Sequence, residues 1–293
     1  MHADELHTDA ALVRRLLAEQ FPEWAGLPIE PVPSSGTDNA LYRLGDDMVV
    51  RLPRRPSGGS SIAREYEWTQ RLGQYLPVAV PEALAKGAPS HGYPASWAVY
   101  GWLDGANPEA GNAAEPVALA RDLARLIRAF GEIDLDGPPT RRGAPLATQD
   151  AAARRALEQL EGVIDVDAAV VSWDAALAAP AWSDAPRWLH GDLLPGNLLV
   201  HDGRLTGVLD FSLVGVGDPA CDLMPAWCVL PAAARETFRR EVAVDDATWA
   251  RGRGWALSMG LIALPYYMDT NPGFAAVARQ AIGEVMVETN MCS

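Results

Sequence analysis

Lysine and cysteine are both rare in this sequence of 293 residues. Lys86 is the only lysine among the 24 basic residues, so arginine carries nearly all of the positive charge. A reaction step that needs a lysine must therefore use Lys86 or do without one. The three cysteines, Cys221, Cys228 and Cys292, form no CxxC pair and have no histidine at metal-site spacing. This pattern argues against a disulfide framework and a structural zinc site and predicts reduced thiols, as in cytoplasmic proteins.

Long apolar runs and an excess of positive charge are also missing. The longest apolar run, residues 255–268, is shorter than the roughly 20 residues of a membrane span and contains Pro265. The first residues lack the basic region and apolar stretch of a secretory signal, so we expect a cytoplasmic protein. The net charge of −14 argues against nucleic-acid and membrane-surface binding and favours cationic small molecules. No feature of the sequence indicates an obligate protein partner.

The first third of the chain has the pattern of a small sheet with helices. Hydrophobic residues make up 49% of the sequence, which excludes global disorder. Apolar residues at helical spacing predict helices at residues 9–21 and 62–75, the second preceded by a Pro/Gly/Ser-rich loop at residues 53–61. Short β-like segments with a hairpin turn at Gly45-Asp46-Asp47 predict strands at residues 29–32, 40–44, 48–52, 83–85 and 96–100.

The rest of the chain is mostly helical in pattern. Helical periodicity predicts helices at residues 115–130, 150–160, 168–178, 231–240, 246–268 and 274–288. Residues 187–209 are the exception, because short apolar runs alternate there with polar turns such as His201-Asp202-Gly203. The sequence therefore predicts an α+β protein with two domains, residues 1–101 and residues 102–293.

Polar residues suited to metal binding and proton transfer lie at the ends of these short apolar runs. They are His190, Asp192 and Asn197, followed by Asp210 after the next run. Asparagine and aspartate supply the oxygen ligands that suit Mg²⁺, and a second aspartate left off the metal is able to orient or deprotonate a hydroxyl. Kinase catalytic loops of the form H-x-D-x-x-x-x-N, followed by a metal-binding aspartate, divide the roles in this way.

Three segments together carry a resemblance to a known family. They are His190-Gly191-Asp192-Leu193-Leu194-Pro195-Gly196-Asn197, Leu209-Asp210-Phe211 and Gly217-Asp218-Pro219-Ala220-Cys221-Asp222-Leu223. With them the chain resembles the aminoglycoside phosphotransferase family of antibiotic kinases, over nearly its whole length. The resemblance implies a two-lobed, protein-kinase-like α+β fold. Residues 1–101 would form a small, β-rich nucleotide-binding lobe, and residues 102–293 a larger, mainly helical lobe for catalysis and acceptor binding.

The same resemblance implies roles for the loop residues. Asp192 would be the catalytic base that accepts the proton of the acceptor hydroxyl, and His190 would brace the loop. Asn197 and Asp210 would hold Mg²⁺ on the phosphates of ATP or GTP. For Asp218 and Asp222, helix capping and structural hydrogen bonds are at least as good an interpretation as catalysis.

Arg51 stands where kinases place the lysine that touches the nucleotide phosphates, in the strand expected at residues 48–52. Arginine keeps the charge and is able to bind two phosphate oxygens, although its bulk and geometry differ from those of lysine. A snorkelling arginine on an edge strand is the alternative. By the resemblance, its partner would be Glu65, on the helix expected at residues 62–75, and Glu67 is the weaker choice because it points to another helical face.

Two further segments are candidates for nucleotide contacts. Ser35 and Gly36 lie between the first two expected strands, where a kinase-type fold covers the phosphates with backbone N–H groups, although an ordinary turn is the alternative. Tyr100 and Trp102 lie in the segment joining the two domains, where the base would sit. Aromatic residues of this kind are more often part of the core. Backbone contacts to the base leave the choice between ATP and GTP open.

The surplus of acidic residues is uneven and bears on the acceptor. Residues 1–101 hold 9 basic and 12 acidic residues, a net charge of −3, whereas residues 102–293 hold 15 and 26, a net charge of −11. A polycationic aminoglycoside would be attracted to such a lobe, although a generic solvated acidic surface is the alternative. Candidate acceptor contacts near the carboxyl end are Asp269, Glu284, Glu288, Trp255 and Tyr266.

The sequence bears on three alternative functions. A macrolide or another natural-product or metabolite hydroxyl is the main rival acceptor. A catalytically silent, nucleotide-binding pseudokinase is suggested by Arg51 and by Ser212, which stands where protein kinases have the glycine of D-F-G. Asp192, Asn197 and Asp210 are all present, which disfavours that interpretation. A kinase acting on proteins is disfavoured because no Ala-Pro-Glu segment follows Asp210.

Overall fold

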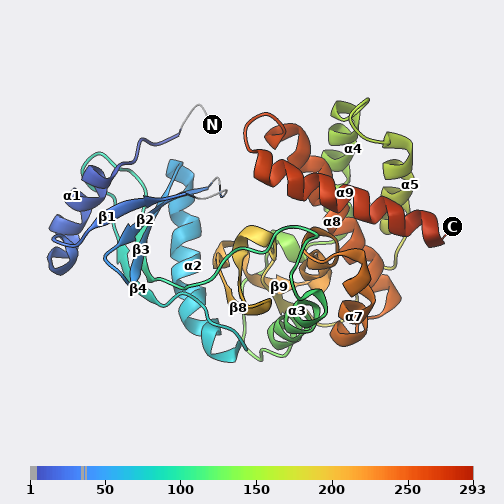
Figure 1. Ribbon diagram of the computed structural model, residues 1–293, viewed down its shortest axis with the longest axis horizontal. Helices are drawn as coiled ribbons and strands as arrows, with labels where there is room; N and C mark the ends of the chain where they lie inside the picture. Colours follow the sequence, from blue (N-terminus) through green and yellow to red (C-terminus); the bar gives the residue numbers. More distant parts are fainter. Residues whose placement is uncertain (1–4, 34–35, 37, 293) are drawn as a thin grey trace. The chain divides into compact units, whose positions relative to one another are not determined.

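The computed structural model describes residues 5–33, 36 and 38–292, with side chains described as far as Glu288. The chain divides into two units (Figure 1). Unit 1 consists of Met1–Gln74, Ala79–Asp104 and Gly207–Ser212, and unit 2 consists of Tyr75–Val78, Gly105–Thr206 and Leu213–Ser293. The segment 207–212, which carries Asp210, thus belongs to unit 1 although it lies late in the sequence.

Unit 1 is built on a five-stranded antiparallel sheet with the order β1-β2-β3-β5-β4. Its strands are β1 (Ile29–Val32), β2 (Asn39–Leu44), β3 (Met48–Pro53), β4 (Ala83–Gly87) and β5 (Trp97–Gly101). The β2–β3 hairpin turns at Gly45, whose φ of 59° is in the left-handed region that glycine adopts without strain. Lys86 is exposed on β4, with its ammonium group 5.9 Å from the centre of the Tyr66 ring.

The two faces of this sheet pack against different helices, α1 (Ala10–Gln20) and α2 (Gly59–Leu72). The core on the α1 side includes Leu16, Leu17, Leu44, Val50, Leu52, Trp97 and Val99. The core on the α2 side includes Ile62, Ala83, Ala98 and Tyr100. Side chains alternate between the faces of a strand, so Arg51, between Val50 and Leu52, lies on the face that carries α2. The sheet therefore directs Arg51 toward the helix that contains Glu65.

Helix α2 begins earlier than the sequence predicts. The loop expected at residues 53–61 ends in a 3₁₀ turn at Pro56–Gly58, and α2 begins at Gly59 rather than at residue 62. Proline fixes φ near the value that a first helical turn needs, which favours this early start. Gly59 packs closely against the backbone of Ser96, since a Cβ on Gly59 would be 3.0 Å from the Ser96 nitrogen. The expected helix also ends earlier, at Leu72, and a second 3₁₀ turn covers Gly73–Tyr75.

Unit 2 is mainly helical. Its longer helices are α3 (Pro116–Gly131), α4 (Asp150–Gln159), α5 (Val166–Leu177), α7 (Ala232–Val242), α8 (Asp246–Tyr267) and α9 (Pro272–Cys292). Helix α8 begins after Asp245, whose carboxylate accepts the Thr248 N–H at 2.8 Å. Helix α9 packs on α8 (Figure 1). Their backbones approach closely at Gly260, where a Cβ would lie 2.8 Å from the Ile282 side chain and 2.9 Å from the Ala278 carbonyl oxygen.

Short strands interrupt the helices of unit 2 near the predicted loop. Strand β6 (Arg187–Leu189) pairs with β9 (Gly215–Gly217), and β7 (Leu198–His201) pairs with β8 (Arg204–Val208). The β7–β8 turn falls at Asp202 and Gly203, which both have positive φ, as the turn expected at residues 201–203 requires. Strand β9 and the short helix α6 (Pro225–Cys228) are not predicted from the sequence. None of the helices in the described ranges has the length and apolar content needed to cross a membrane.

Candidate active site

One buried carboxylate, that of Asp222, holds the backbone of the loop that follows β6. The backbone N–H groups of His190 and Gly191 each donate to an oxygen of Asp222, both at 2.7 Å. Burial raises the pKa of Asp222 above its ordinary value, while His190 and the two N–H donors oppose that rise. Gly191 has a φ of 84°, and a Cβ there would lie 3.1 Å from the Leu213 carbonyl oxygen. Asp222 therefore holds the backbone of a tight turn, in agreement with the structural interpretation of this residue.

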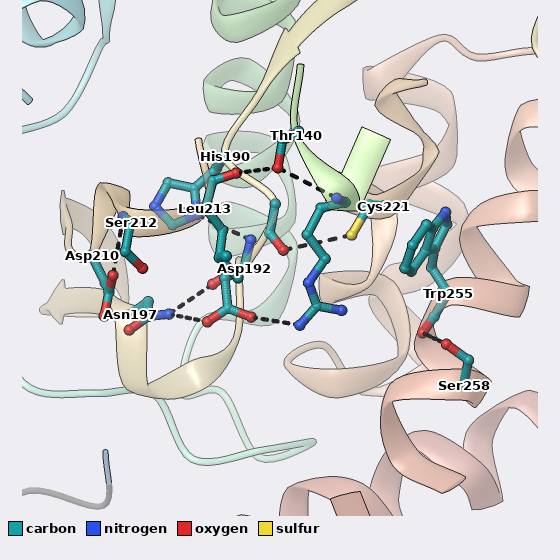
Figure 2. A network of polar contacts seen from close by, with 12 residues as sticks. Thr140, His190, Asp192, Asn197, Asp210, Ser212, Leu213, Cys221, Trp255 and Ser258 are labelled. Atoms are coloured by element: carbon teal, nitrogen blue, oxygen red, sulfur yellow. Dashed lines mark hydrogen bonds and ion pairs between the residues drawn. The ribbon is translucent and has the colours of Figure 1, made fainter. Parts of the chain in front are cut away.

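Asp192 follows this turn and has partners on both carboxylate oxygens. The Asn197 amide nitrogen donates to the Asp192 carbonyl oxygen and to Oδ2, both at 2.9 Å (Figure 2). Arg142 Nη2 donates to the other carboxylate oxygen, Oδ1, at 3.3 Å. The Asp192 N–H donates to Nδ1 of His190, whose side chain is fully buried. Unit 2 thus brings together His190, Asp192 and Asn197, all three of the loop residues that the sequence singles out.

The remaining members of the predicted site, Arg51, Glu65 and Asp210, meet within unit 1. Arg51 Nη1 is paired with Glu65 Oε1, the partner expected from the sequence, and Nη2 donates to Asp210 Oδ2 at 2.9 Å. Asp210 has a φ of 65°, which is uncommon for a residue with a side chain. Its second oxygen accepts the Ser212 N–H at 3.2 Å (Figure 2). One guanidinium therefore bridges a helix carboxylate and the aspartate of the Leu209-Asp210-Phe211 segment.

The two carboxylates on Arg51 have opposite pKa shifts. Burial raises the pKa of Glu65 to about 8, against the attraction of Arg51. Burial also acts to raise the pKa of Asp210, but Arg51 and the Ser212 donors outweigh it and lower the pKa below the ordinary value. The pKa of Arg51 itself is raised, because the two carboxylates outweigh its burial. The lowered pKa of Asp210 favours its ionised form, which is the form that binds a cation.

The oxygens available at these residues suit magnesium better than a soft metal. The Asn197 amide nitrogen is used on Asp192, which leaves Oδ1 as its free ligand atom, and Asp210 offers a carboxylate. Among the described residues, no three His, Cys, Asp or Glu side chains are grouped as metal ligands. Mg²⁺ is commonly held by one or two protein oxygens together with substrate phosphates and water. Asn197 in unit 2 and Asp210 in unit 1 therefore each carry an oxygen of the kind that Mg²⁺ binds together with a nucleotide.

The other predicted nucleotide contacts differ in how far they are buried. Tyr100 is buried, with its ring 6.3 Å from that of Tyr66, so it belongs to the core between the sheet and α2. Trp102 is half-buried; its ring lies 3.9 Å from the Arg43 guanidinium carbon, and its Nε1 donates to Asp104 at 3.0 Å. Gly36 is exposed, and Ser35 lies outside the described residues.

The structure places three of the five candidate acceptor contacts in the core or in internal ion pairs. Trp255 has no exposed surface, so its ring is not available to cover a sugar. Glu284 and Glu288 are paired with Arg235 from α7, and Glu288 also accepts the indole N–H groups of two tryptophans, Trp227 and Trp249. These carboxylates therefore fasten α9 to the core. Asp269 and Tyr266 are exposed near the end of α8.

Other carboxylates of unit 2 are engaged in the same way. Asp122 is bound by Arg204 through two hydrogen bonds of 2.7 and 2.8 Å, and Asp218 is bound by Arg251 at 2.7 and 3.3 Å. Both aspartates are buried. Such one-to-one ion pairs leave the net charge of −11 over residues 102–293 unchanged, because each pair removes one positive and one negative charge, but they show that some of the acidic side chains counted there are structural.

Sequence reasoning missed two residues that hold the loop. Asn107 donates through its amide nitrogen to the carbonyl oxygens of Gly196, at 3.1 Å, and Leu198, at 2.8 Å, on either side of Asn197. Arg142 binds Asp192 from a segment fifty residues earlier. Neither lies in a recognisable motif, and no local pattern connects them with the loop.

Solved structures with the same fold include antibiotic phosphotransferases. The GDP complex of wild-type aminoglycoside 2'-phosphotransferase-IIIa is 18% identical to this chain, with 96% of this chain and 100% of that chain covered and a TM-score of 0.73. The apoenzyme of macrolide 2'-phosphotransferase MphH from Brachybacterium faecium is 25% identical, with 94% and 97% covered and a TM-score of 0.60. No curated protein matches the sequence.

The fold and these likenesses show a two-lobed, kinase-like architecture, in which unit 1 carries the antiparallel sheet and unit 2 most of the helices. The family model described as the phosphotransferase enzyme family matches residues 29–255, and the chain belongs to this family. The resemblance to the aminoglycoside phosphotransferases and the expected fold class are thereby confirmed. The protein is an enzyme that transfers phosphate groups.

Proposed function

We propose that this enzyme transfers the γ-phosphate of ATP or GTP to a hydroxyl of a small molecule, and that the acceptor is an antibiotic. The observation that carries the proposal is the loop 190–197, where Asp192 is presented between Asn197 and Arg142 and the backbone is fixed by Asp222. Phosphoryl transfer asks for little covalent chemistry, so positioning of the hydroxyl and neutralisation of phosphate charge account for most of the catalysis.

Each predicted residue has a role in this proposal. Asp192 accepts the proton of the acceptor hydroxyl as the oxygen attacks phosphorus. Arg51 binds phosphate oxygens, and Glu65 holds its guanidinium in place. Asn197 and Asp210 each offer an oxygen to Mg²⁺. When bound, the metal neutralises charge on the phosphates and orients them.

Two acceptor classes are supported by different observations. The net charge of −11 over residues 102–293 favours a polycationic aminoglycoside, as do the structures of aminoglycoside phosphotransferases that share the fold. A macrolide is favoured by the 25% identity with MphH, against 18% for the aminoglycoside enzyme cited above. We place the aminoglycoside first, with a macrolide as the second candidate.

The deciding experiment is a matched screen of donors and acceptors. The purified enzyme is given ATP or GTP with Mg²⁺, and phosphorylation of kanamycin, gentamicin and erythromycin is followed by mass spectrometry. We expect one class of acceptor to gain a single phosphate, and Asp192→Ala to abolish this gain while nucleotide binding, measured by calorimetry, is retained. Turnover by Asp192→Ala would refute the assignment of the base. Nucleotide binding without any phosphorylated acceptor would favour the pseudokinase alternative.

The physiological setting is part of the same proposal. An enzyme that uses ATP or GTP and inactivates an antibiotic would act in the cytoplasm and confer resistance. Expression of the wild-type gene in a susceptible host should raise the inhibitory concentration of the accepted antibiotic, whereas expression of Asp192→Ala should not. Equal inhibitory concentrations for both strains would separate the enzyme activity from a role in resistance.

A further inference from the structure

Arg142 and Arg125 each bind a carboxylate of unit 2 by one hydrogen bond, whereas Arg204 and Arg251 each bind theirs by two. Arg204 and Arg251 each use Nε and Nη2 together, so that both oxygens of one aspartate are bound. Arg142 makes one bond, from Nη2 to Asp192 Oδ1 at 3.3 Å. Its Nε is buried without a hydrogen-bond partner among the described residues.

The segment that carries Arg142 is fastened at both ends. Thr140 Oγ1 donates to the Leu213 carbonyl oxygen at 2.7 Å (Figure 2), and its N–H donates to Val216 at 3.3 Å. The Gly143 carbonyl oxygen accepts the Asp218 N–H at 2.9 Å. These bonds tie the segment to residues 213–218 at either side of the arginine, so the start of its side chain has little freedom.

Two glycines make the second attachment possible. A Cβ on Gly143 would lie 2.7 Å from the Gly217 Cα, and a Cβ on Gly217 would lie 2.4 Å from the Gly143 carbonyl oxygen. The two backbones are thus in direct contact, and any side chain would separate them. The 3₁₀ turn Arg141–Gly143 is closed by the Arg142 N–H donating to Thr140 Oγ1 at 3.3 Å.

The head of the Arg142 side chain is also confined. Its side chain is 20% exposed, and its guanidinium carbon lies 5.9 Å from the centre of the Trp255 ring, which is fully buried in α8. The Asp192 carboxylate is free to rotate about its last side-chain bond unless both oxygens are held. Asn197 holds Oδ2 from within the loop, and Arg142 holds Oδ1 from outside it.

We propose that Arg142 is a positioning residue, which fixes the plane of the Asp192 carboxylate so that one oxygen faces the acceptor hydroxyl. This proposal rests on the proposed role of Asp192 as the base. A single bond from Arg142 to Oδ1 is compatible with this role. A carboxylate oxygen accepts two hydrogen bonds without loss of geometry.

The test compares the kinetics of three single variants, Arg142→Met, Arg142→Lys and Asp192→Asn. The double variant Arg142→Met/Asp192→Asn is measured beside them, and kanamycin and erythromycin serve as acceptors. We expect Arg142→Met to lower kcat by about 10-fold to 100-fold, the scale of a misplaced reacting group, with the KM for nucleotide changed by less than about 2-fold. Arg142→Lys should recover part of the loss. The double variant should be no slower than Asp192→Asn, because the arginine acts through the aspartate.

Arg125→Met is the matched control, since Arg125 also binds a carboxylate of unit 2, that of Asp122, and should leave kcat unchanged. A double variant slower than Asp192→Asn by the full factor of Arg142→Met would overturn the proposal. Full activity in Asp192→Asn would instead refute the proposed base, a distinct result. If neither acceptor is phosphorylated, the crystal structure of Arg142→Met decides: a rotated Asp192 carboxylate supports the proposal, and an unchanged one refutes it.

Discussion

Asp222 offers the sharpest test of how the active loop is held, through the single substitution Asp222→Asn. The change preserves size but replaces one of the two acceptor oxygens by an NH₂ group. That group would face the backbone N–H of His190 or Gly191, which now donates to the carboxylate at 2.7 Å. One buried N–H then loses its partner and the other loses an ionised one.

The expected cost follows from these two bonds. A buried donor left without a partner costs about 1–3 kcal/mol, and loss of charge assistance from the second bond adds about 1 kcal/mol. We therefore expect Asp222→Asn to lower the free energy of unfolding by about 2–4 kcal/mol, measured by urea denaturation with tryptophan fluorescence. We also expect a lower kcat, because the turn that presents Asp192 is loosened.

Asp245→Asn is the matched control, since Asp245 caps α8 from a less buried position. Asparagine and aspartate cap helices about equally well, so this substitution should cost less than about 1 kcal/mol. Equal free energies of unfolding for the two variants would refute the reasoning, because the buried pair of N–H bonds would then carry no more weight than an ordinary helix cap.

Two further predictions concern packing and pH in unit 2. Burial acts to raise the pKa of Asp122, but Arg204, the Leu205 N–H and Arg125 outweigh burial and lower this pKa. Ionised Asp122 therefore stabilises the folded protein above its unfolded pKa of about 3.8. This stabilisation is lost as the pH falls through the lower pKa of the folded state. Asp122→Asn should thus be less stable than wild type at pH 7 by about 1–3 kcal/mol, and the difference in urea denaturation should shrink below pH 4; a constant difference would contradict the ion pair as its source. Gly260→Ala should lower Tm despite the better helix propensity of alanine, because overpacking at the α8–α9 contact costs about 1–3 kcal/mol, and a raised Tm measured by calorimetry would show that α9 shifts freely.

The elements with strong local patterns were predictable from the sequence. Helix α1 shows its apolar face through Leu12, Leu16 and Leu17, and the β2–β3 hairpin shows its turn through Gly45. Strand β9, by contrast, is Gly-Val-Gly, a composition that strands disfavour. It is extended because it pairs with β6, which is a tertiary contact without a local signal.

The candidate site shows the same division. The spacing of His190, Asp192 and Asn197 pointed to the loop, and the family resemblance gave Glu65 as the partner of Arg51. Arg142 was invisible because its partner is fifty residues away and its own segment forms only a 3₁₀ turn. The internal contacts of two acceptor candidates were not visible either, because a count of carboxylates does not reveal that Glu284 and Glu288 are both paired with Arg235.

The exposed Lys86 on β4 has a consequence for chemical probes of this enzyme. Reagents that acylate amines or form imines with them would modify this one side chain. The buried cation of unit 1 that pairs with Glu65 and Asp210 is the guanidinium of Arg51, which is not nucleophilic at neutral pH. Covalent inhibitors designed for the phosphate-contacting lysine of kinases would therefore find no target in that cluster. The same lysine is instead a single handle for attaching a dye or a surface to unit 1.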